Sequence, residues 1–140
     1  ISISHTTYAG CHHDGENPID SNNNGVLFLN SEIGFEDIED GSSNTLLVGE
    51  HFIDIGDLGW VSGTRATLRN TSKIEERPEN WRQREAPHDP FYVGGFGSYH
   101  PGCLQIGLAD GATRVLSNTT SKEVLYQLGN RSDLEIPKAP

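Results

Sequence analysis

The sequence has little positive charge, no methionine and no long apolar run. Its 140 residues hold 10 lysines and arginines against 20 aspartates and glutamates, a formal net charge of −10 at pH 7. Because no basic stripe is present to neutralise phosphates, we expect no nucleic-acid partner. The longest apolar stretches, such as Val26-Leu27-Phe28-Leu29, fall far short of the roughly 18 residues needed to cross a bilayer, so the chain itself is expected to be soluble.

The chain starts at Ile1 and contains no methionine. We therefore expect it to be a processed form or an excised fragment, with any signal or anchor outside it.

Cysteine is also scarce. Cys11 and Cys103 are the only two in the sequence, and no C-x-x-C is present, which excludes a zinc knuckle or a thioredoxin-type motif. In an exported protein the pair would form one disulfide that links the N-terminal segment to a C-terminal hairpin. Two buried free thiols are the alternative, and the sequence leaves both open.

Familiar catalytic motifs are missing too. The sequence has no G-x-S-x-G nucleophile elbow, and the glycine-rich stretch Val93-Gly-Gly-Phe-Gly97 lacks the lysine and the helix that follow a phosphate-binding loop. Without a recognisable catalytic constellation, we expect the chain not to be an enzyme.

The composition predicts one domain over residues 1–140, with many loops around a small core, because only 34% of residues are hydrophobic while 16 are glycine. The predicted order is an ordered loop over Thr6–Asn24, a short buried strand over Val26–Leu29, a strand over Thr45–Glu50, one or two strands within 59–69 and a long loop over Asn70–Pro90.

A hairpin and a helix are predicted to follow. Asp110-Gly111 suits the two central positions of a type I′ turn, which would place Leu104 opposite Ser117 and Leu108 opposite Thr113. Thr120-Ser-Lys-Glu123 has the form of a capping box, and the apolar stripe after it stops at Gly129. The predicted fold class is therefore α+β: a small antiparallel sheet with long irregular loops and a short C-terminal helix.

His100 and Asp110 are the first pair to weigh as an active site. Ten residues of extended strand would separate them by about 30 Å, so they are not expected to form a catalytic dyad. We interpret His100 as an anchor at the entry of the strand and Asp110 as a turn former.

Two loops carry metal-capable side chains. His12, His13 and Asp14 are adjacent in sequence, but neighbouring histidines do not form the i, i+4 pair of a helical zinc site. Asp20, Asn22 and Asn24 match the opening of a calcium loop, although its twelfth position is Ser31 instead of a glutamate. No cofactor is required by the main interpretation. A calcium- or transition-metal-dependent binding module or enzyme is the alternative, and it needs at least three of these side chains to converge.

Two longer motifs occur in order along the chain. The first is Asp40-Gly-Ser-Ser-Asn-Thr-Leu-Leu-Val-Gly-Glu50, and the second runs from His100-Pro-Gly to Leu-Ala-Asp110-Gly-Ala-Thr-Arg-Val-Leu-Ser117. Together they resemble the signature of a prepilin-like family that is abundant in planctomycete bacteria and carries the H-x9-DG domain, domain of unknown function 1559. Cys103 replaces the second glycine of that pattern, and Ala112-Thr113 replace Ser-Val. The residues that the resemblance marks as structural are His100, Pro101, Gly102, Asp110, Gly111, Asp40, Gly41, Asn44, Gly49 and Glu50.

The family is similar to type IV pilins and type II secretion pseudopilins, in which a cleaved leader and a long hydrophobic N-terminal helix precede a globular head. The resemblance thus implies a non-enzymatic structural or assembly subunit. It implies an exported protein, periplasmic or at the cell surface, anchored in the membrane only through an N-terminal helix absent from this chain. The implied partners are other pilin-like subunits or cell-surface proteins, contacted through the loop over Asn70–Pro90.

Overall fold

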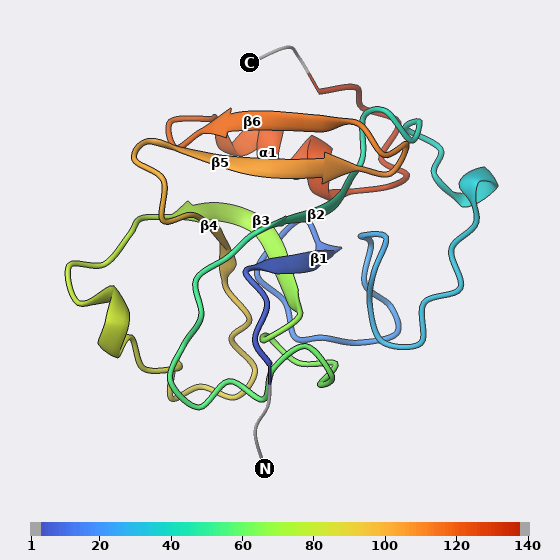
Figure 1. Ribbon diagram of the computed structural model, residues 1–140. Helices are drawn as coiled ribbons and strands as arrows, with labels where there is room; N and C mark the ends of the chain where they lie inside the picture. Colours follow the sequence, from blue (N-terminus) through green and yellow to red (C-terminus); the bar gives the residue numbers. More distant parts are fainter. Residues whose placement is uncertain (1–3, 138–140) are drawn as a thin grey trace.

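The computed structural model describes residues 4–137, apart from the side chain of Arg82, and it contains one six-stranded sheet and one short helix (Figure 1). The strands are β1 (Tyr8–His13), β2 (Leu46–Glu50), β3 (Leu68–Glu75), β4 (Gly95–Gly97), β5 (Cys103–Leu108) and β6 (Thr113–Ser117), the helix is α1 (Lys122–Gly129), and single 3-10 turns lie at Phe35–Asp37 and Trp81–Gln83. The α+β prediction is confirmed. Within residues 4–137, no helix has the length and apolar character needed to span a membrane.

The sheet is mixed, where a purely antiparallel one was predicted. Its strand order is β4-β3-β1-β2-β5-β6. The pairs β1–β2, β2–β5 and β5–β6 are antiparallel, whereas β1–β3 and β3–β4 are parallel. The first strand of the chain therefore lies in the interior of the sheet.

Two predictions about the N-terminal third are wrong. Residues 8–13, predicted as part of a loop, form β1, and Val26–Leu29, predicted as a strand, forms bends and a turn. The segment runs beside β1, where the Leu27 amide donates to the Cys11 carbonyl at 3.0 Å. A Cβ on Gly10 would lie 2.8 Å from Leu27 Cδ1, so a glycine in the strand permits this close approach.

A third correction concerns β3. The long loop was predicted to begin at Asn70, but the strand continues to Glu75. Its centre is polar and buried: Arg69, Asn70 and Thr71 are at most 1% exposed. Because such residues are typical of surface loops, their burial in a strand gives no hydrophobic alternation in the sequence.

The hairpin forms, but with a different turn. Leu108 accepts from the Gly111 amide at 3.0 Å, and its own amide donates to Ala112 at 2.8 Å, so the loop has three residues, 109–111. Only Gly111 of this loop has positive φ (+86°), as in a type I turn followed by a bulge. The register therefore shifts by one residue, and Leu104 pairs with Leu116 instead of Ser117.

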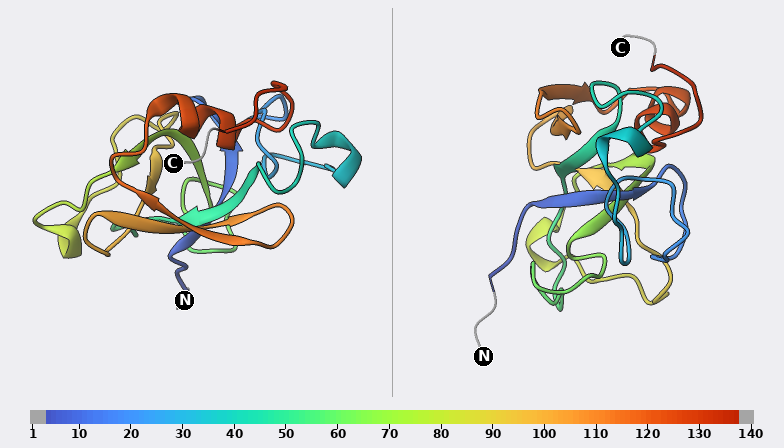
Figure 2. Two further views of the ribbon diagram at one scale, coloured as in Figure 1. Left: turned by 90° about the horizontal axis from the view of Figure 1, so that it is seen from above. Right: turned by 90° about the vertical axis from the view of Figure 1, so that its right-hand side faces the viewer.

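The core lies between the sheet and α1, which packs against one sheet face (Figure 2). Its buried apolar side chains are Ala9, Cys11, Leu46, Phe96, Leu104, Ile106, Leu108, Leu116, Leu125 and Leu128. The predicted helix is confirmed, but Ser121 replaces Thr120 as its N-cap, because the Ser121 hydroxyl accepts from the Val124 amide.

Candidate functional site

The two sequence motifs lie side by side in the structure. The motif over 40–50 contains β2, the motif over 100–117 contains the β5–β6 hairpin, and β2 pairs with β5. Leu46 lies opposite Leu108, and Gly49 lies opposite Ile106. The motifs are therefore one structural unit.

One end of this unit is held by Glu50. Its Oε2 accepts from the Gln105 amide at 2.7 Å, and its Oε1 lies 3.5 Å from His100 Nε2. The neighbouring Gly49 must lack a side chain, because a Cβ there would lie 2.8 Å from Phe96 Cδ1. Glu50 thus fixes β5 to β2 at the strand entry that His100 begins.

The other end is held by backbone contacts of the hairpin turn. The Asp110 amide donates to the Ser42 carbonyl at 3.1 Å, and the Ala109 amide donates to the Thr45 carbonyl at 2.9 Å. Asp110 Oδ1 accepts from the Ala112 amide at 2.8 Å and so shapes the turn itself. Arg114 adds a contact from Nη2 to the Ser43 carbonyl at 3.2 Å.

Asp40 links the first motif to the end of the chain. It is 6% exposed, and its two carboxylate oxygens accept from the amides of Leu134 (2.6 Å) and Asp133 (3.2 Å). Asn44 donates from Nδ2 to the Asp40 carbonyl at 2.9 Å, and Gly41 has φ +91°, a conformation suited to glycine. This carboxylate anchors the C-terminal tail.

The remaining motif residues form the strand entry. Pro101 and Gly102 are exposed, Gly102 has φ +76°, and its carbonyl accepts from the Asn118 amide at 2.9 Å. His100 and Asp110 lie at opposite ends of β5. The structure therefore keeps His100 and Asp110 apart.

The metal-capable side chains make separate local contacts instead of converging. His12 is fully buried with Nδ1 3.0 Å from Asn23 Oδ1, whereas His13 Nδ1 lies 2.9 Å from the neighbouring Asp14 Oδ1. Asn24 Oδ1 accepts from the Asp14 amide at 3.0 Å.

The residues of the calcium-like loop do not converge either. Asp20 Oδ1 accepts from the Ser21 amide at 2.5 Å, and Asn22 is exposed. In the described part of the chain, no group of three or more histidine, cysteine, aspartate or glutamate side chains is arranged to hold a metal ion.

The two cysteines are free thiols, so the disulfide alternative is not realised. Cys11 lies on β1 and Cys103 on β5, with β2 between them. Two strand spacings amount to about 10 Å, beyond the roughly 7 Å limit for bridged Cα atoms. Burial raises the pKa of the Cys11 thiol to about 12, which keeps it protonated.

Sequence reasoning missed a buried cluster of charges centred on Asp54. This carboxylate is 1% exposed and forms ion pairs with Arg65 and with Arg84, the latter over 2.7 Å from Nε to Oδ1. The fully buried Arg69 lies 3.7 Å from the same carboxylate, and Arg84 also pairs with Glu75. These charges are spread over residues 54–84 without a regular spacing, so no local motif reveals the cluster.

Buried and partly buried hydrogen bonds surround these charges. Arg69 donates from Nη1 to the Val93 carbonyl at 2.8 Å. Glu16 accepts from the amides of Val93 (2.7 Å) and Gly94 (3.0 Å). Burial and the Arg69 charge lower the pKa of His51 to about 4, so the ring is neutral at pH 7.

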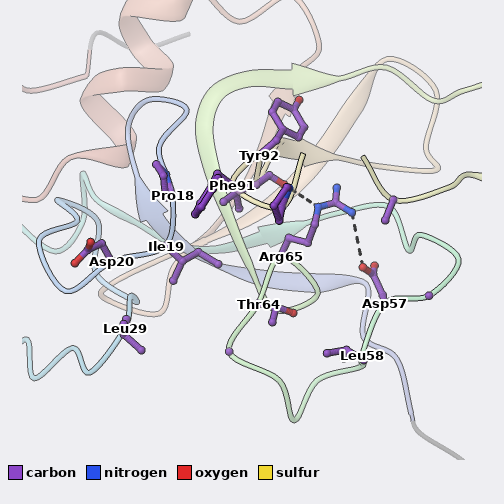
Figure 3. A pocket seen from close by; sticks show the side chains of 15 residues that line it. Pro18, Ile19, Asp20, Leu29, Asp57, Leu58, Thr64, Arg65, Phe91 and Tyr92 are labelled. Atoms are coloured by element: carbon purple, nitrogen blue, oxygen red, sulfur yellow. Dashed lines mark hydrogen bonds and ion pairs between the residues drawn. The ribbon is translucent and has the colours of Figure 1, made fainter. Parts of the chain in front are cut away.

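A cleft of about 530 Å³ borders this cluster, and Figure 3 shows Arg65 in its wall beside Asp57. Its remaining wall includes Ile19, Leu58 and Phe91, so it is largely apolar. Arg65 is already paired with carboxylates, and among the residues that the structure describes, neither histidine nor cysteine lines the cleft. The arrangement suits the burial of an apolar group better than acid–base or nucleophilic chemistry.

Comparison with protein families gives a match over most of the chain. A family model described as a protein of unknown function (DUF1559) matches residues 2–123, a range that contains both motifs. Comparisons with curated proteins and with solved structures gave no match.

Proposed function

The chain belongs to the DUF1559 family, and from this membership we propose that it is the globular head of a pilin-like, exported subunit with a structural or assembly role. In this proposal the head is non-enzymatic and needs no cofactor. It lies in the periplasm or at the cell surface and is joined to the membrane through a helix that precedes it. Its partners are other pilin-like subunits or cell-surface proteins.

The observation that carries the proposal is the role of the motif residues. Glu50, Asp40 and Asp110 each bind backbone amides, and together they hold β2, the hairpin and the C-terminal tail in place. Signature residues that hold strands and turns in place indicate that members of the family share a fold. A shared reaction would instead place signature side chains around a common cavity.

The acidic surface supports the same proposal. With a net charge of −10, the head repels nonspecific neighbours and nucleic acid, so its contacts depend on particular surfaces with less charge. Such a surface is a sheet edge, which can pair with another protein through backbone hydrogen bonds.

Cell fractionation of the full-length protein, expressed from its own gene in its own host, tests the proposal. We expect the protein in the envelope fraction and in material sheared from the cell surface, with a processed N-terminus. A cytosolic marker protein provides the control. Recovery with that marker, without processing, would overturn the proposal.

A further inference from the structure

The two edges of the sheet are protected to different degrees. At one edge β4 has only three residues, all buried, and Phe52 lies close enough that a Cβ on Gly97 would be 2.5 Å from its ring. At the other edge β6 has five residues, of which four are exposed, and Figure 1 shows no strand beyond it. Natural sheets usually cover, shorten or charge such an edge, because it can pair with another chain.

The hydrogen-bond pattern shows which groups the open edge presents. The Leu108 amide of β5 donates to the Ala112 carbonyl, and the Asn118 amide donates to the carbonyl of Gly102, just before β5; such bonds recur at every second residue along an antiparallel pair. Arg114 and Leu116 therefore also face β5, whereas Thr113 and Val115 point their N–H and C=O groups outward. Within residues 4–137, no other segment donates to or accepts from the outward groups of these two residues.

Side chains and charge favour a second copy of the chain at this edge. Val115 is 62% exposed in the middle of the strand. The hairpin over residues 103–117 contains one cationic and one anionic side chain, a net charge of 0, which leaves the whole charge of −10 on the rest of the chain. Two acidic molecules therefore meet the least repulsion when their hairpins face each other.

We propose that β6 pairs antiparallel with β6 of a second copy, around a two-fold axis at Val115. Val115 then lies opposite its own equivalent, and Thr113 lies opposite Ser117 of the second copy, whose carbonyl already accepts from Thr120, so the pairing is centred on Val115. Arg114 lies opposite Leu116 of the second copy, so no like charges face each other. The inference rests on the proposed assembly role. It names the partner as a second copy of the chain and specifies the register in which the two β6 strands pair.

Cysteine cross-linking tests the register. In a Cys103→Ser background, Val115→Cys places two thiols on strands with Cα atoms about 5.5 Å apart, within disulfide range. The matched control is Thr113→Cys, on the same exposed strand, whose equivalents would be about 14 Å apart. We expect Val115→Cys to give at least about tenfold more covalent dimer under mild oxidation. Equal yields from the two variants would overturn the register.

Sedimentation velocity over a concentration series tests the edge itself. Val115→Pro removes the outward N–H without touching the bonds to β5, and Val115→Lys places a charge opposite its own copy. We expect each to weaken dimerisation by about tenfold to a hundredfold, with the melting temperature unchanged at dilutions where the wild type is monomeric, while Val115→Thr keeps the N–H and the dimer. Added salt should strengthen the wild-type dimer, because it screens the net negative charge.

The outcomes separate this inference from the proposed function. A monomer at all concentrations, or a dimer that survives both Val115→Pro and Val115→Lys, would overturn the β6 pairing. Either result leaves the fractionation experiment unaffected. Recovery from the cytosol would overturn the assembly role even if the purified chain dimerised.

Discussion

Two regions of this domain are held together by different interactions. The apolar half consists of β2, β5, β6 and α1, which enclose a cluster of leucine and isoleucine side chains. The ionic half consists of the loops over 51–67 and 76–94 with the adjoining β3, and it is organised around Asp54 and Arg69. The comparison shows that a small chain with few apolar residues can order a second half by burying paired charges.

Removing Asp54 should break the ionic half and give the largest effect. Asp54→Ala leaves Arg65 and Arg84 without their shared buried carboxylate, and we expect a loss of about 3–5 kcal/mol in the free energy of unfolding. Chemical denaturation measures this loss. Native-state hydrogen exchange should show faster exchange in residues 51–94 than in β5 and β6.

The control for Asp54→Ala is Glu39→Ala, which removes the same charge from an exposed position. Its expected effect is within about 0.5 kcal/mol. If both substitutions lowered the free energy of unfolding by similar amounts, the loss would reflect the change in net charge and not the buried ion pairs. The distinction between an ionic and an apolar half would then be wrong.

Leu104→Ala should break the apolar half. The side chain is 1% exposed in the core cluster, and its truncation leaves a cavity that costs about 2–5 kcal/mol. Denaturation of this variant beside the neighbouring Gln105→Ala, whose side chain is exposed, measures the effect. A loss below about 1 kcal/mol would contradict the role assigned to this cluster.

The apolar half was also the part that the sequence predicted best. Alternation at Leu104, Ile106 and Leu108 indicated a strand with one buried face, and all three side chains are 1% exposed. The turn was one residue off because Asp110-Gly111 fits both the centre of a two-residue loop and the end of a three-residue loop. A single extra loop residue moves Leu116 onto the core face.

The ionic half could not be predicted because its signals are not local. In β3, the buried Arg69 and Asn70 are residue types that usually mark a solvated segment. Their burial depends on partners such as Val93 and Glu16, far away in sequence. For the same reason the sequence indicated the motif residues of the candidate site but not Asp54.

Lowering the pH should destabilise the ionic half through protonation of His51. Its pKa is lowered to about 4 in the folded state, mainly by burial, against about 6.5 when unfolded. Because only the unfolded state takes up this proton between those values, stability should fall as the pH drops from about 6.5 to 4, by up to about 3 kcal/mol. Urea titrations across this range, compared with His51→Asn, isolate the contribution. Parallel curves for the two proteins would contradict it.

The smallest expected effect concerns the helix cap in the apolar half. Ser121→Ala removes the hydroxyl that accepts from Val124, and we expect a loss of about 1 kcal/mol. Thr120→Ala, at the cap predicted from the sequence, should cost less in the same thermal or chemical denaturation. A larger effect at Thr120 would restore the capping box as the start of the helix.

The interior position of β1 also has a consequence for folding kinetics. This strand precedes the other five in the sequence, yet it pairs with β2 on one side and β3 on the other, so it has both neighbours only after β3 has been made. Contacts between segments so far apart in sequence slow folding, because a long loop must close before any contact stabilises it. A growing chain would thus be able to pair β1 with β2 once Glu50 has been made, but the β3 side of β1 would stay open until more than half of the domain has been synthesised, and we expect a chaperone to bind that open edge.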